Sequence, residues 1–106
     1  MNIKISANQL RFRIKQDEVE ILTQNGRLDF SINLGVQSFA YSILLADLGR
    51  NLALDIQEST WKLLVDRKNF LQFLNSLPSR TGIEQKLLIN DSQIELILDV
   101  DLRRKH

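Results

Sequence analysis

The sequence lacks cysteine, and its single histidine, His106, stands at the last of its 106 positions. The absence of cysteine excludes disulfides, thiolate metal sites and cysteine nucleophiles, and it is typical of a protein in a reducing cytosol. A terminal histidine is held by no scaffold, so it is a poor general base or metal ligand. Ser-His and Cys-His nucleophile systems are therefore excluded, and the sequence predicts no catalytic residue, no metal site and no cofactor.

An excess of charge of either sign is also missing, because 14 basic side chains accompany 13 acidic ones. Proteins that rely on phosphate contacts normally carry a clear basic excess, so nucleic-acid binding is disfavoured. No apolar run approaches the ~20 residues of a membrane-spanning helix, and the first residues do not resemble a signal peptide. We expect one soluble domain over residues 1–106, located in the cytoplasm, with no membrane contact.

What the sequence does contain is an alternation of apolar and polar residues that keeps one phase from Leu28 to Val65. This period is typical of half-buried strands, here over Leu28–Leu34, Phe39–Leu45, Leu52–Ile56 and Trp61–Val65. The apolar sets also match across the turns, with these residues opposed: Leu34 and Phe39, Leu45 and Leu52, Ile56 and Trp61. The pattern predicts an antiparallel meander with one dry face, in which Tyr41 and Trp61 belong to the core.

The two ends of the chain are predicted to be hairpins. At the N-terminal end, a turn at Ala7-Asn8 sets Ile5 opposite Leu10, and a bulge over residues 6–9 is the alternative. At the C-terminal end, Gln85–Asn90 and Gln93–Leu102 flank a turn at Asp91-Ser92, with these residues opposed: Ile89 and Ile94, Leu87 and Leu96. The second of these strands is longer than the first, so we expect it to overhang as an unpaired edge.

Two short helices complete the pattern, Gln16–Asn25 with a stop at Asn25-Gly26, and Arg67–Ser76 with Asp66 as its N-cap. Pro78 ends the second helix, and residues 79–82 form a loop. No repeat of fixed period is evident. The sequence predicts an α+β fold, in which a curved antiparallel sheet of order ββαββββαββ carries both helices on one face. A sheet curled into a partial β-barrel is the alternative.

The candidate ligand-binding residues are Asn8, Arg11 and Arg13. Two guanidinium groups at positions i and i+2 of one strand project side by side, as a phosphate or carboxylate clamp requires. Cross-strand ion pairs with neighbouring acids are the alternative, and Asn8 also fits a simple turn residue. Carboxylates of the polar face offer a second candidate, a divalent cation site; these are Asp29, Asp55, Glu95, Asp99 and Asp101.

The segments Met1–Ile5 and Asn8–Ile14 resemble the start of a family of small uncharacterised bacterial proteins. That family has a Lys/Ile alternation, an Asn, and a strand in which apolar residues alternate with Arg. The resemblance continues through Glu18–Glu20, Asn25-Gly26 and Phe39–Tyr41, and this chain departs from it at Ala7, where Gly is usual. It implies this fold and a bacterial source, and no activity.

We therefore expect a non-catalytic binding or protein-interaction module that acts through a sheet face or edge. Its partner is an unknown protein or a second copy of the chain. One alternative is a ligand- or metal-dependent enzyme that uses the carboxylates and arginines of the polar face. Another is a weak nucleic-acid binder that uses Arg11, Arg13 and the basic tail, residues 103–106.

Overall fold

The computed structural model describes residues 1–77 and 82–102. Pro78, the predicted loop at 79–81 and the basic tail at 103–106 lie outside the described residues. The predicted order of elements and the α+β class are confirmed. The elements are β1 (Asn2–Ser6), β2 (Gln9–Lys15), α1 (Gln16–Asn25), β3 (Arg27–Asn33), β4 (Ser38–Ala46), β5 (Leu52–Gln57), β6 (Thr60–Asp66), α2 (Arg67–Asn75), β7 (Ile83–Ile89) and β8 (Ser92–Asp101).

The strands form two mixed four-stranded sheets, which corrects the single antiparallel meander. Sheet A has the order β1-β2-β8-β7 and sheet B the order β3-β4-β6-β5, with β2–β8 and β4–β6 parallel. Leu45 therefore lies opposite Val65 of β6, and the predicted pairing of Leu45 with Leu52 is wrong. The alternation of side chains fixes the face that a strand presents but not its neighbour. Both sheets are open, so the alternative of a partial barrel is not adopted.

The register was predicted correctly for the two hairpins that have two-residue turns, at Ala7-Asn8 and at Glu58-Ser59. Ile5 faces Leu10, and Ile56 faces Trp61. In the other two hairpins the observed register differs from the predicted one by two residues. Phe39 faces Ile32, and Ile94 faces Leu87. A shift of two residues keeps every side chain on its face, so the apolar pattern alone does not detect it.

The turns explain these two shifts. Leu34 N–H donates to the Gln37 carbonyl over 2.8 Å, which places residues 34–37 outside the strands. The last hairpin turns at Asn90 and Asp91, which have φ angles of 49° and 66°. Asn and Asp tolerate this left-handed conformation better than most residues, so the turn forms there and not at Asp91-Ser92.

The chain consists of two similar ββαββ units, a repeat that the sequence analysis missed. Each sheet takes the first hairpin of one unit and the second hairpin of the other. Buried positions of the first unit recur 51 residues later in the second, as in Phe12 and Leu63, Ile14 and Val65, Leu22 and Phe73. The backbone bonds that join the central strands also correspond, because Glu95 N–H donates to the Asn8 carbonyl and Ala40 N–H to the Ser59 carbonyl. The repeat preserves the order of elements and these buried apolar positions, and hardly any residue identity.

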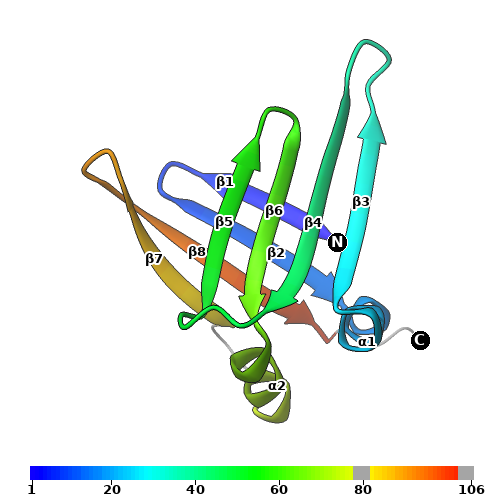
Figure 1. Cartoon of the computed structure of the whole chain (residues 1–106), viewed down its shortest axis with the longest axis vertical. Coiled ribbons are helices and arrows are strands. Elements are labelled where there is room, and N and C mark those ends of the chain that lie inside the picture. The colour runs from blue at the N-terminus through cyan, green and yellow to red at the C-terminus, as the bar shows by residue number, and fades with distance from the viewer. Residues whose placement is uncertain (78–81, 103–106) are drawn as a thin grey trace.

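The two sheets lie in two layers with their strands crossing, and both helices lie at one end of the layers (Figure 1). The prediction that the helices cover one face of a sheet is therefore wrong. Leu22 of α1 and Phe70 and Phe73 of α2 join the core that fills the space between the sheets. Asp66 caps α2 as predicted, since its carboxylate accepts from Asn69 N–H at 3.1 Å. No described helix has the length and apolar character needed to cross a membrane.

At the opposite end, the hairpins of each sheet extend past the other sheet. The β3–β4 and β5–β6 hairpins rise beyond the edge strand β1, whereas the β1–β2 and β7–β8 hairpins project beyond β5 (Figure 1). Each layer therefore has a stretch of inner face with no strand of the other layer directly opposite. We call the first stretch the sheet B overhang and the second the sheet A overhang.

Gly82 is expected to be the glycine least tolerant of a side chain. Its φ is 74°, and a Cβ there would lie 2.6 Å from the Leu98 carbonyl oxygen and 2.9 Å from Asp99 Cβ. We expect Gly82→Ala to lower the free energy of unfolding by about 2–4 kcal/mol, from backbone strain and overpacking together. Gly49→Ala is the control, because Gly49 has a φ of 72° with no neighbour within 4 Å. It should lose only about 1–2 kcal/mol in urea denaturation, and equal losses would contradict the close packing at Gly82.

Candidate functional site

Arg11 and Arg13 are joined to acids of the neighbouring strand, as the alternative interpretation predicted. Arg11 Nη1 lies 2.7 Å from Asp99 Oδ2, and Arg13 Nε lies 3.6 Å from Asp99 Oδ1. Arg13 Nη2 also lies 4.0 Å from Asp101. The parallel register of β2 and β8 brings these side chains together on the outer face of sheet A. The pair is therefore neutralised and does not present a vacant anion clamp.

Asn8 belongs to the β1–β2 turn and is apart from this ion-pair cluster. It lines a polar hollow of about 340 Å³ with residues from three strands, and neither arginine lines it; its other lining residues are Gln9, Lys86, Gln93 and Glu95. Gln9 Nε2 donates to Glu95 Oε1 over 3.0 Å. The three predicted ligand-binding residues thus do not form one site in the described structure.

The polar-face carboxylates are divided between the two layers. Asp29 and Asp55 belong to sheet B, and the others belong to sheet A. Asp29 accepts from Arg27 over 2.8 Å and from Ser42 Oγ over 2.7 Å. The hydrogen bond from Arg27, supported by that from Ser42, lowers the pKa of Asp29. Among the described residues, no three His, Cys, Asp or Glu side chains are placed to hold a metal ion.

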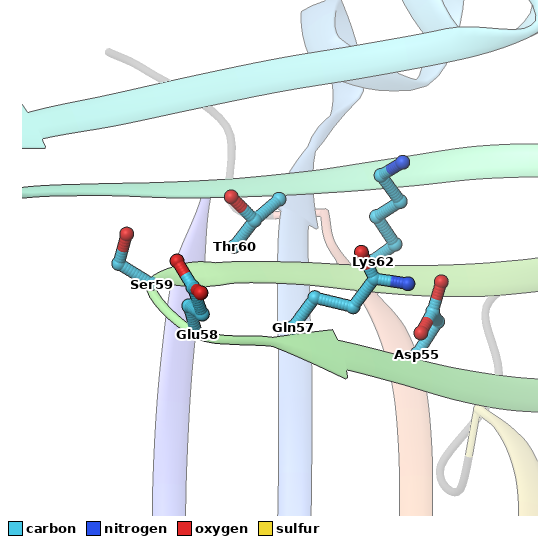
Figure 2. Close-up of a pocket in the computed structure, with 6 residues that line it drawn as sticks. All are labelled: Asp55, Gln57, Glu58, Ser59, Thr60 and Lys62. Carbon is cyan, nitrogen blue, oxygen red and sulfur yellow. The ribbon is translucent and has the colours of Figure 1, made fainter.

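A second polar hollow, of about 420 Å³, lies on the outer face of sheet B beside the β5–β6 turn. Figure 2 shows its lining side chains, which are Asp55, Gln57, Glu58, Ser59, Thr60 and Lys62. Asp55 and Lys62 are opposed across the two strands, and Glu58 adopts a φ of 49° in the turn. None of the six residues is buried, so water competes for every polar group. This surface offers solvated groups of both charge signs and no preorganised chemistry.

The most distinctive cavity is apolar and lies under the sheet B overhang. Its volume is about 280 Å³, and its lining comes from the edge strand of sheet A and the inner face of sheet B: Ile3, Ile5, Ile32, Phe39, Tyr41 and Trp61. We call this cavity the apolar cleft. Ile5 and Ile32 remain 65% and 50% exposed, which is unusual for side chains on the dry face of a sheet. The prediction of Tyr41 and Trp61 as closed core is therefore corrected, because both are only partly buried.

The aromatic side chains of the apolar cleft are held in place by their neighbours. Tyr41 stacks on Phe30 with ring centroids 5.5 Å apart, and Phe39 meets Trp61 edge to face at 6.5 Å. Such pairs contribute roughly 0.5–1.5 kcal/mol beyond the burial of their area. These ring contacts within sheet B support the walls of the cleft. Sequence reasoning identified the apolar phase but had no signal for the overhang, which depends on how the two sheets cross.

The sheet A overhang is lined differently. Leu10 and Leu96 are opposed there, in place of Trp61 and Tyr41, and Leu96 is fully buried. Leu96 of β8 thus corresponds to Tyr41 of β4. Two residues earlier on each strand, Ile94 corresponds to Phe39. The two overhangs thus share a backbone geometry, and one is aromatic where the other is aliphatic.

Residues 1–104 match the family described as "Family of unknown function (DUF7009)". No curated protein and no solved structure matches the chain.

The engagement of Arg11 and Arg13 is tested by removing the charge of their shared partner. Asp99→Asn should lower the free energy of unfolding by about 1–2 kcal/mol, since the side chain of Asp99 is largely buried against Arg11. Inorganic phosphate should then stabilise the variant more than the wild type, because the guanidinium groups become available.

Asp29→Asn is the matched control, because it breaks the exposed pair with Arg27 and should cost less than about 1 kcal/mol. Thermal unfolding at constant ionic strength, with phosphate or chloride, measures both effects. Equal stabilisation of wild type and Asp99→Asn by phosphate would mean that the arginines are already available to anions.

Proposed function

We propose that this chain, which belongs to the family of unknown function DUF7009, is a non-catalytic binding module whose apolar cleft receives an apolar group. The observation that carries this proposal is the set of partly exposed aromatic and isoleucine side chains that line the cleft. Exposed apolar surface that is contiguous and rimmed by polar residues is a common mark of a binding site.

The size and chemistry of the cleft define what it accepts. A volume of about 280 Å³ is slightly smaller than the roughly 300–1,000 Å³ of small-molecule sites. It therefore suits a part of a ligand, such as one or two aliphatic or aromatic groups. Tyr41 and Trp61 are the lining side chains that carry a polar atom, so recognition rests on apolar contact. Burial of one Val, Leu or Ile side chain contributes about 1.5–3 kcal/mol.

The other functions find less support in the described residues. An enzyme or a nucleic-acid binder built on Arg11 and Arg13 would need these groups available, and both are paired with acids. A bacterial source, a cytoplasmic location and a protein partner or second copy remain predictions.

The fluorescence of Trp61 tests the proposal, because it is the single tryptophan and lines the apolar cleft. We expect 1-octanol and cyclohexanol to shift its emission to shorter wavelength in a saturable way, and glycerol to have no effect. An acidic group in the cleft should oppose this binding, so Ile32→Asp should weaken it at least about tenfold.

Ile89→Asp is the control, because Ile89 is 44% exposed against 50% for Ile32 and lies on β7, at the edge of sheet A remote from β1. Both variants should lose similar stability, and only Ile32→Asp should lose the response. A linear response without saturation, or an equal loss in both variants, would contradict binding in the apolar cleft.

A further inference from the structure

We propose that the free edge of β1 accepts an extended peptide segment of a protein partner as an additional strand. Apolar side chains of that segment would occupy the apolar cleft, and acidic side chains would lie beside Lys4. This inference rests on the proposed function, since it names the class of partner for the same cleft. Addition of a strand to a sheet edge combines backbone hydrogen bonds with pockets for alternate side chains.

The backbone of β1 presents its hydrogen-bonding groups at the right positions. Asn8 accepts from Glu95 of β8, so even-numbered residues of β2 face β8 and odd-numbered residues face β1. The β1 partners of the odd residues Gln9, Arg11 and Arg13 are Ser6, Lys4 and Asn2. The N–H and C=O groups of Ile3 and Ile5 therefore point to the free edge of the sheet. These same two residues line the apolar cleft.

The sheet B overhang provides a second wall for an added strand. β1 is the edge strand of sheet A, and the hairpins of sheet B rise beyond it (Figure 1). A strand bonded to Ile3 and Ile5 would lie beneath this overhang and continue the sheet A layer. Its inward side chains would contact Ile32, Phe39 and Trp61, whose exposed surfaces lack an opposing strand among the described residues.

The other edges of the two sheets fit a peptide less well. On β3, Phe30 and Ile32 use their backbone groups to bond to β4. The residues next to them have free backbone groups, but the side chains of those residues face outward. On β7 the Glu84 carbonyl already accepts from Asn51 Nδ2 at 2.9 Å. The edge of β5 corresponds to that of β1 in the repeat, but it borders the aliphatic sheet A overhang.

The charge of the outer face near β1 defines the rest of the partner. The outward residues of β1 are Asn2, Lys4 and Ser6, and none is acidic. The acids that pair with Arg11 and Arg13 lie on β8, two strands away from the free edge. Opposite charges on neighbouring strands attract, so an acidic residue suits the position beside Lys4. The preferred segment therefore alternates apolar with acidic residues.

The test uses blocked seven-residue peptides and the fluorescence of Trp61. The first peptide alternates valine with glutamate, the second replaces glutamate by lysine, and the third is the first with N-methyl groups on its edge-facing amides. We expect the first to bind, the second to bind about 2- to 5-fold more weakly, and the third to lose at least about tenfold. Lys4→Glu should reverse the preference between the first two peptides.

Two proline variants locate the edge. The Ile5 N–H faces the free edge, so Ile5→Pro removes a donor from that edge without breaking the β1–β2 ladder. Ile56→Pro makes the same change at the corresponding position of β5. We expect the first variant to abolish peptide binding and the second to preserve it. Loss of binding in Ile56→Pro alone would overturn the assignment to β1.

The possible results separate this inference from the proposed function. Two results would overturn strand addition and leave the apolar cleft as a binding site. In the first, the N-methylated peptide binds as tightly as the unmodified one. In the second, cyclohexanol binds but none of the three peptides does. Failure of both cyclohexanol and peptides would overturn both proposals. A dimer in light scattering that Ile5→Pro dissociates would show that a second copy occupies the edge, and would overturn the assignment to a foreign peptide.

Discussion

The parallel pairing of β2 with β8 and of β4 with β6 is the constraint on which the rest of the structure depends. Each of these pairings joins strands from different ββαββ units, so neither unit completes a sheet by itself. The central strands carry most of the fully buried residues, with Phe12, Ile14, Ile43 and Leu63 among them. Their N–H and C=O groups are consumed on both sides, and the unpaired edges remain only on the four outer strands.

The crossing of the two sheets then creates the candidate site. Because the hairpins extend past the opposite layer, inner-face side chains near the turns keep an apolar character without full burial. The two units would make two equivalent sites if their sequences were alike. Instead, Phe39, Tyr41 and Trp61 occupy positions that Ile94, Leu96 and Leu10 occupy on the other side. The proposed binding site is therefore the overhang at which aromatic residues break the repeat.

The sequence predicted the elements well and the arrangement poorly, for a physical reason. Alternation reports which face of a strand is dry, and capping residues such as Asp66 and Gly26 report where helices begin and end. Neither signal reports which strand lies beside which, so the two sheets were read as one. The Arg11 and Arg13 pair was visible as a pattern, but its partner Asp99 is 88 positions away. The apolar cleft was hidden because its residues share the phase of the core.

Methyl NMR of the isoleucine side chains during a titration with cyclohexanol is the most direct test of this account. The chain has isoleucines in the apolar cleft, at positions 3, 5 and 32, and exposed isoleucines outside it, at position 21 on α1 and position 89 on β7. We predict saturable shifts for the methyl groups of Ile3, Ile5 and Ile32 and none for those of Ile21 and Ile89. Shifts of equal size in both groups, or none in either, would contradict the claim that the aromatic overhang forms the binding site.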